Sequence, residues 1–248
     1  MVWRWRLLTF CCWPLLWWQG KRVRAMALRL PEAAGSRAGT SGQGTALRLL
    51  ICGDSAAAGV GIQQQTEALA GKLVSQLASR HQVEWQLHAK TGLDTHGLLE
   101  LLQELPCQAV DVVVVSIGVN DVTGICSDRR FTQQIDALLH CLDQRFSQPV
   151  ILFSAIPPMQ HFTALPAPLK HWLGLKAAML NCQLVAALNP HPKAFVVSTA
   201  FPLKESVLAA DGFHPSAAGC QLWAMALEQE LSLIINDHHS AGATDKPA

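Results

Sequence analysis

The feature that most constrains the fold is AVDVVVVSIG, residues 109–118, a nearly continuous run of β-branched and apolar residues. Such a strand has no polar face, so both of its faces must be covered, as in a parallel sheet between two layers of helices. Comparable strand-like runs occur at 46–53, 83–89, 149–156 and 194–200, and segments with helical periodicity separate them, at 66–80, 95–105, 131–146, 169–189 and 216–235. This alternation predicts an α/β fold: a three-layer α/β/α sandwich with a flavodoxin-like five-stranded parallel sheet spanning residues 46–235.

Composition narrows the classes of protein to which the chain can belong. Half of its 248 residues are hydrophobic and 15% are charged, which excludes a disordered chain. The formal net charge is +1 and no basic stripe is present in the predicted domain, so nucleic acid is not expected as a partner. The eight cysteines are scattered without the spacing of metal ligands, and we predict no metal and no cofactor.

The N-terminal 30 residues form a segment of their own. Twelve mostly apolar residues, 7–18, lie between basic residues on both sides, and five of the eight tryptophans fall in the first eighteen positions. The apolar part is shorter than the ~20 residues that span a bilayer. We expect a retained membrane-proximal anchor, with a cleaved signal peptide as the alternative, which places the protein at a membrane, in a periplasm or outside the cell. Residues 31–45 are expected to form a flexible linker and 236–248 a disordered tail.

The glycine-rich stretch LLICGDSAAAGVG, residues 49–61, follows the first predicted strand. A phosphate-binding loop of the Walker type requires lysine after its last glycine, where the chain has Val60. A dinucleotide-binding loop that starts at Gly59 requires glycine at the position of Gln64. Both templates fail, which leaves two interpretations: a tight connection after the strand, or a loop that holds Ser55 as a nucleophile.

Candidate site residues follow four of the five predicted strands. Ser55 follows the first strand, Gly92 the second, Asn120 the third, and Asp211 and His214 the fifth. Since the carboxyl ends of parallel strands share one edge of the sheet, these residues are expected to meet there. A serine nucleophile needs a general base and donors for an oxyanion, and this set contains both kinds of group.

The same segments resemble a known family. GDS at 53–55, the Gly92 turn, GVND at 118–121 and DGFH at 211–214 are similar to the four blocks of the SGNH (GDSL-type) hydrolases, above all their bacterial lipolytic acyl-hydrolase or arylesterase-like branch. One departure is Ala56, where the familiar motif has leucine.

The resemblance implies a role for each matched residue. Ser55 would be the nucleophile, His214 the base and Asp211 its orienting carboxylate. The oxyanion would be bound by the backbone N–H groups of Ser55 and Gly92 and by the side-chain amide of Asn120. Two neighbouring aspartates, Asp54 and Asp121, are expected to hold the loops by hydrogen bonds, and a third, Asp94, to cap a helix.

The substrate is less constrained. Pro157, Met159 and Phe162, after the fourth predicted strand, suggest an apolar lip for an acyl chain, although a proline-rich loop packed on itself explains them equally well. The favoured function is a serine esterase that hydrolyses lipid or small acyl esters through an acyl-enzyme, in the manner of lysophospholipases, arylesterases or thioesterases. The alternatives are a carbohydrate O-acetylesterase and a non-catalytic, membrane-tethered binding module on the same fold.

Overall fold

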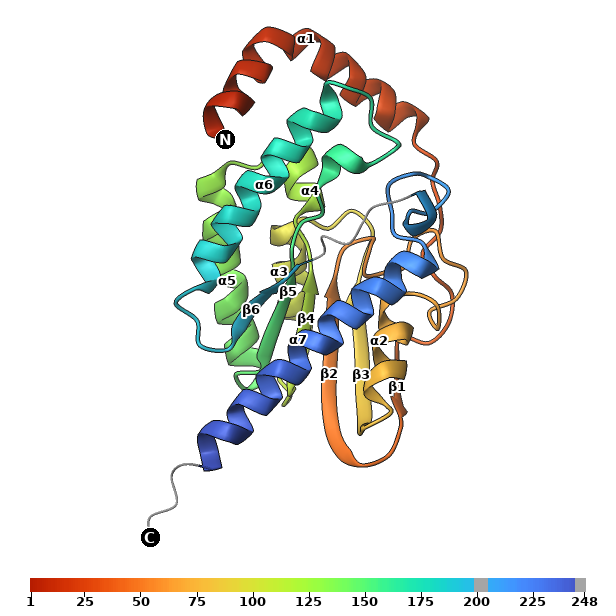
Figure 1. Cartoon of the computed structure of the whole chain (residues 1–248), viewed down its shortest axis with the longest axis vertical. Helices are drawn as coiled ribbons and strands as arrows, with labels where there is room; N and C mark the ends of the chain where they lie inside the picture. The colour runs from red at the N-terminus through yellow and green to blue at the C-terminus, as the bar shows by residue number, and fades with distance from the viewer. Residues whose placement is uncertain (199–204, 244–248) are drawn as a thin grey trace.

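The computed structural model describes residues 1–198 and 205–243 (Figure 1). Its centre is a six-stranded sheet in the order β1-β3-β2-β4-β5-β6. The strands are β1 (Ala38–Ser41), β2 (Thr45–Gly53), β3 (His81–Ala89), β4 (Val112–Ser116), β5 (Val150–Ser154) and β6 (Ala194–Val197). All neighbouring strands pair in parallel except β1, which runs antiparallel to β3. The predicted α/β sandwich is therefore confirmed.

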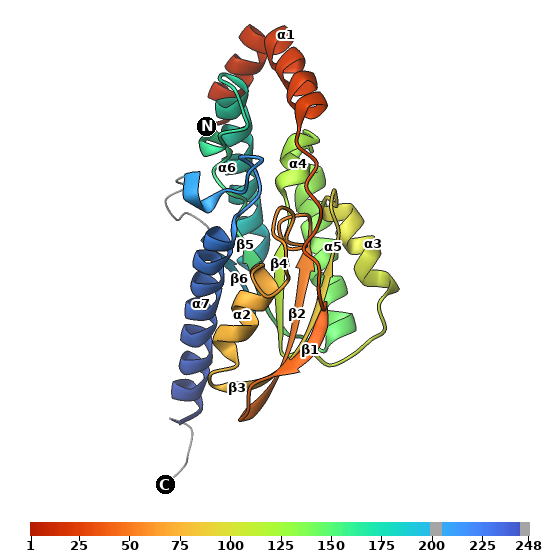
Figure 2. The ribbon, with the colours of Figure 1, turned by 90° about the vertical axis from the view of Figure 1, so that its right-hand side faces the viewer.

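Helices cover both faces of the sheet (Figure 2). One core contains α2 (Leu69–Leu77) and α7 (Ala217–Ala243), and the other contains α3 (Thr95–Glu104), α5 (Asp128–Phe146) and α6 (Leu169–Leu188). Successive residues of a strand point to opposite faces, so Leu49 and Ile51 of β2 belong to the first core and Leu50 and Cys52 to the second. A strand between two cores must be apolar throughout, which explains the valine run of β4, whose five residues are all buried.

The sheet has one strand more than the sequence predicted. Four residues, Ala38–Ser41, form β1, which pairs with Val83 to Gln86 of β3. They belong to the segment expected to be a flexible linker, which instead is held against the sheet. The same segment makes a parallel bridge at Ala34 to Gln64.

The N-terminal segment is helical. Helix α1 (Val2–Met26) packs along α6, where Trp5 stacks on Trp172 with 5.4 Å between ring centroids and Thr9 Oγ1 accepts a 2.7 Å hydrogen bond from Trp172 Nε1. Leu16 is 3% exposed and belongs to the core that contains α6. None of the helices in residues 1–198 and 205–243 combines the length and apolarity that crossing a membrane requires.

The described part of the chain contains three further short helices, α4 (Val119–Thr123), η1 (Met159–His161) and η2 (Glu205–Val207). At the C-terminus, α7 continues to Ala243, so the first part of the predicted tail is helical, and residues 244–248 lie outside the described residues. The last two residues of the strand predicted over 194–200 also lie outside them.

Candidate active site

The turn that carries Ser55 is fixed by the close approach of two strands. A Cβ atom at Gly53 would lie 2.1 Å from the carbonyl oxygen of Ser116, so only glycine fits at this end of β2. The next residue, Asp54, donates its backbone N–H to the same carbonyl at 3.0 Å. Its side-chain Oδ1 accepts a 3.0 Å bond from the backbone N–H of Ala56. Ser55 therefore stands on a turn held from both sides.

Ser55, His214 and Asp211 form one chain of hydrogen bonds. Ser55 Oγ lies 2.9 Å from His214 Nε2, and His214 Nδ1 lies 2.6 Å from Asp211 Oδ2. The His214 and Asp211 side chains are 17% and 6% exposed. The structure thus brings together three residues that the sequence predicted to meet, across a separation of 159 positions.

The aspartate of this chain is well fixed. Asp211 Oδ1 accepts 3.0 Å bonds from the backbone N–H groups of Phe213 and His214. Partial burial raises the pKa of Asp211, but the hydrogen bonds from His214 and Phe213 outweigh it and hold that pKa below its ordinary value. An ionised Asp211 selects the His214 tautomer that carries its proton on Nδ1, which leaves Nε2 free to accept the Ser55 proton.

The two further residues predicted to bind an oxyanion lie in loops that contact each other. Gly92 has φ of +89°, and no atom lies within 4 Å of the position a Cβ would take there. Asn120, in the first turn of α4, donates from Nδ2 to the carbonyl oxygen of Leu93 at 2.7 Å. A side-chain amide carries two N–H groups, so one remains for a ligand while the other fixes the Gly92 loop.

The neighbouring aspartates act as expected, by hydrogen bonding to loops. Asp121 Oδ2 accepts from the backbone N–H of Thr95 at 3.1 Å and from its hydroxyl at 2.9 Å, and Asp94 Oδ1 caps α3 by accepting from Gly97 N–H at 2.9 Å. Burial is the main cause that raises the pKa of Asp54, to about 7, and it also raises the pKa of Asp121.

The residues predicted to line an acyl site are largely internal. Met159 has no exposed surface and Phe162 is 4% exposed, so they belong to the core and not to an open lip; Pro157 is partly buried. Phe162 instead packs edge-to-face on Phe213 at 4.8 Å, and Phe213 packs on His214 at 5.3 Å. The prediction of an open apolar lip is therefore wrong for Met159 and Phe162; of the two, the Phe162 ring packs against the loop that carries His214.

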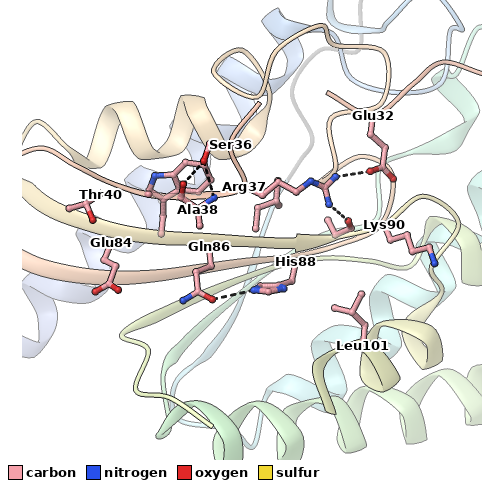
Figure 3. Close-up of a pocket in the computed structure, with 14 residues that line it drawn as sticks. Glu32, Ser36, Arg37, Ala38, Thr40, Glu84, Gln86, His88, Lys90 and Leu101 are labelled. Carbon is pink, nitrogen blue, oxygen red and sulfur yellow. Dashed lines mark hydrogen bonds and ion pairs between the residues drawn. The ribbon is translucent and has the colours of Figure 1, made fainter. Parts of the chain in front are cut away.

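A groove of about 870 Å³ lies over β1 and β3 (Figure 3). Its walls include Glu32, Arg37, His88 and Lys90. Ser55, His214 and Asp211 do not line it. This groove could not be predicted from the sequence, because one of its walls is β1, a strand that was not predicted.

Comparison with known proteins identifies the family of the chain. The sequence pattern of the GDSL-like Lipase/Acylhydrolase family matches residues 51–222. No curated protein matches the chain.

Several solved structures share the fold. A psychrotrophic esterase from Pseudoalteromonas sp. is 17% identical, with a TM-score of 0.58 over 76% of this chain and 98% of the other. A lipase/acylhydrolase from Enterococcus faecalis is 18% identical, with a TM-score of 0.59 over 75% and 95%. A variant of an acetyl xylan esterase from Geobacillus stearothermophilus is 19% identical, with a TM-score of 0.57 over 75% and 95%. By the family pattern, the chain belongs to the GDSL-like lipase/acylhydrolase family and is a serine ester hydrolase.

Proposed function

We propose that the protein hydrolyses carboxylic esters through an acyl-enzyme on Ser55, with lipid or other acyl esters as substrates. The observation that carries this proposal is the unbroken chain of hydrogen bonds from Ser55 through His214 to Asp211. Nothing further is needed to activate the hydroxyl, because a neutral imidazole within hydrogen-bond distance can accept its proton as the oxygen attacks.

The reaction proceeds in two balanced halves. Ser55 Oγ attacks the ester carbonyl carbon while its proton passes to His214 Nε2, and the resulting tetrahedral intermediate expels the alcohol, which takes that proton. Water then repeats the attack on the acyl-enzyme, again giving a proton to His214, and collapse returns the proton to Ser55 and releases the carboxylic acid. Asp211 stabilises the imidazolium formed in each half.

Negative charge develops on the carbonyl oxygen in both halves. Three donors are assigned to it: the backbone N–H groups of Ser55 and Gly92 and the free N–H of Asn120. Loss of one such donor lowers turnover by about 10²–10³-fold in serine hydrolases. The hydrogen bond from Asn120 to Leu93 supports this assignment, since it ties one donor to the loop that carries another.

A fluorophosphonate probe tests the nucleophile. We expect covalent labelling of the wild type and none of Ser55→Ala, with turnover of p-nitrophenyl butyrate reduced by at least about 10³-fold. Equal labelling of both proteins would show that another residue is the nucleophile. As a control for folding, the thermal unfolding curve of Ser55→Ala should match that of the wild type.

A preference for substrates at a membrane is supported by α1. Helix α1 carries four large apolar side chains, Trp3, Leu7, Phe10 and Trp17, each between 54% and 87% exposed; we call these four residues the outer stripe. Their spacing of four, three and seven residues places them on one face of a helix. An apolar face of this kind, rich in tryptophan, suits a helix that lies in the plane of a bilayer interface.

The charge around the outer stripe specifies the kind of bilayer. Six of the chain's 19 Lys and Arg residues and none of its 18 Asp and Glu residues lie in the first 31 positions. Lys21 Nζ lies 4.0 Å from the centroid of the Trp17 ring, so basic and apolar groups share one surface. We therefore propose that α1 binds a membrane with anionic headgroups.

The position of α1 links this surface to the reaction. Helix α1 lies at the end of the molecule toward which the carboxyl ends of β2 and β4 point (Figures 1 and 2). Arg24, in its last turn, donates to the carbonyl oxygen of Thr123 in α4, the helix that carries Asn120. A bilayer bound by α1 would thus lie at the end of the molecule that contains Ser55, where it could supply lipid esters.

Vesicle flotation tests the membrane proposal. Full-length protein should bind vesicles that contain phosphatidylglycerol more tightly than vesicles of phosphatidylcholine alone, by about tenfold or more. Replacing Leu7, Phe10 and Trp17 by serine should abolish binding, whereas Val185→Ser, at a residue of α6 that is 53% exposed, should leave it unchanged. Equal binding of the triple variant and the wild type would overturn the proposal.

A carbohydrate O-acetylesterase is the second candidate, because an acetyl xylan esterase is among the structural relatives and because the structure shows no open apolar lip at Met159 and Phe162. Rates on p-nitrophenyl acetate, butyrate and octanoate separate the two. A steep preference for acetate would favour the carbohydrate esterase, whereas rates that hold or rise with chain length would favour acyl-chain substrates.

A further inference from the structure

Residues 31–37 lie before the part of the chain that matches the family, and they contact both backbone segments that supply the assigned oxyanion donors. We call residues 31–37 the N-terminal strap. We infer that the N-terminal strap, through Glu32, is a positioning element that holds the Gly92 loop at a fixed distance from the Ser55 loop. This inference rests on the proposed function, since it assigns a purpose to the spacing of two donors.

On one side, the N-terminal strap is bonded to the loop after Ser55. The backbone N–H of Ala33 donates to Ala58 O at 3.3 Å, and the backbone N–H of Gly61 donates to Pro31 O at 3.0 Å. The buried side chain of Gln65 donates from Nε2 to both Ala33 O and Ala58 O. The strap therefore moves with the nucleophile loop.

On the other side, Glu32 reaches the loop that contains Gly92. Its Oε1 accepts from the backbone N–H of Thr91 at 2.8 Å and from the Thr91 hydroxyl at 2.7 Å. Thr91 directly precedes Gly92, so both bonds act one residue away from the assigned donor.

Arg37 completes the attachment (Figure 3). Its Nη2 lies 2.6 Å from Glu32 Oε2, and its Nη1 donates to the carbonyl oxygen of Ala89, the last residue of β3, at 2.7 Å. Partial burial raises the pKa of Glu32, but the hydrogen bonds from Thr91 and the charge of Arg37 outweigh this effect and hold that pKa below its ordinary value, so the carboxylate stays in its charged, accepting form. Hydrogen bonds thereby connect Glu32, Arg37, Thr91 and Ala89.

The Gly92 loop needs such an attachment. No atom lies within 4 Å of the position a Cβ would take at Gly92, so nothing packs against that position. The loop is tied by the bond from Lys90 N–H to Gly53 O at 3.2 Å and by the bond from Asn120 to Leu93 O, and the bonds from Thr91 to Glu32 add the tie to the N-terminal strap. Displacing a catalytic donor by about 1 Å can cost about 10²-fold in rate. Glu32 is therefore expected to affect kcat and to leave KM nearly unchanged, because the oxyanion forms only in the transition state.

Three variants of the full-length protein test the inference. Glu32→Ala removes both bonds to Thr91, and we expect kcat on p-nitrophenyl butyrate to fall by about 10- to 100-fold with KM within about twofold of the wild type. Glu32→Gln keeps an acceptor oxygen for Thr91 and should retain most of the activity. The matched control is Arg80→Ala, which breaks the exposed ion pair with Glu228 on the face that carries α2 and α7 and should change neither constant.

A second measurement follows the stability of the Gly92 loop independently of catalysis. Amide hydrogen exchange of residues 90–93 should become faster in Glu32→Ala and stay near the wild-type rate in Glu32→Gln and Arg80→Ala. Unchanged kcat and unchanged exchange in Glu32→Ala would overturn the inference. If the wild type hydrolysed no ester, the proposed function would fail, and the exchange rates would still decide whether Glu32 holds the loop.

Discussion

Two carboxyl groups beside the catalytic loops are almost completely buried. Asp54 and Asp121 are each 2% exposed, and each holds backbone or hydroxyl donors of a neighbouring turn. One oxygen of Asp121, Oδ1, is buried without a hydrogen-bond partner among the described residues. Burial raises the pKa of both groups, in the case of Asp54 to about 7, so ionisation of these residues opposes folding.

This burial predicts how stability depends on pH. The pKa of Asp54 is raised in the folded state above its ordinary value of 3.8, so the folded protein binds the proton more tightly. Its contribution to stability is complete below about pH 4 and is lost as the pH rises through about 7, by roughly 4 kcal/mol. Asp54→Asn keeps an acceptor for Ala56 N–H but cannot ionise, and its melting temperature should fall less between pH 4 and pH 8 than that of the wild type. An equal fall in melting temperature for Asp54→Asn and the wild type over this range would show that ionisation of Asp54 does not lower the stability of the folded protein.

At this scale the sequence predicted correctly which residues meet and misjudged their surroundings. Ser55, His214 and Asp211 could be predicted because each follows a strand end in a short motif, and the sheet brings such ends together. Met159 and Phe162 could not be assigned, because an apolar residue in a proline-rich loop looks the same whether it faces a substrate or the core. The contacts of Glu32 were not predicted, because a segment rich in Gly, Ser and Thr is typical of a flexible linker.

Among the elements, the turn from β4 into α4 depends on one glycine. Gly118 has φ of +117°, and a Cβ there would lie 2.7 Å from the side chain of Ile156. The turn directs Asn120 toward the Gly92 loop, so strain at Gly118 would be transmitted to an assigned donor.

Replacing this glycine should therefore destabilise the protein and slow it. We expect Gly118→Ala to lower the free energy of unfolding by about 2 kcal/mol, or the melting temperature by about 5 °C, and to reduce kcat. Gly20→Ala is the matched control: it lies within α1 with open space around it, and alanine there should be neutral or slightly stabilising. Calorimetry on both variants checks this, and equal melting temperatures would contradict it. Adding Ile156→Val to Gly118→Ala should recover part of the loss.

Long elements were predictable and short ones were not. The valine run of β4 and the leucine spacing of α2 indicate a strand and a helix directly, because the side chains that form these patterns fill a core. By contrast, β1 consists of Ala-Gly-Thr-Ser and joins the sheet through backbone hydrogen bonds to β3, which leave no pattern of apolar residues. Likewise, a five-residue helix such as α4 is too short to show a period.

For the molecule as a whole, the folded domain extends beyond the part of the chain that matches the family. The family pattern begins at residue 51, while β1 and the N-terminal strap lie before it. A chain that starts at residue 46 would expose the edge of β3 and lose the bonds of Glu32 to Thr91 in the Gly92 loop.

A pair of truncations measures this difference. Chains 31–248 and 46–248 differ only in the segment that contains β1 and the N-terminal strap. The shorter chain should melt at a lower temperature and aggregate more readily, because β3 becomes an unprotected edge strand. Its kcat should also fall at least as far as that of Glu32→Ala. Equal melting temperature and kcat in the two chains would show that residues 31–45 contribute neither stability nor positioning.

The hydrogen bond between Ser55 and His214 also sets when the protein can become reactive. Its two residues are 159 positions apart, and during synthesis the ribosome releases the serine long before the histidine. Until the last part of the chain has emerged and folded against β2, Ser55 is an unactivated alcohol. By the proposed mechanism, a chain that ends before His214 is therefore chemically inert, and hydrolytic activity reports that the segment with His214 has been made and has folded against β2.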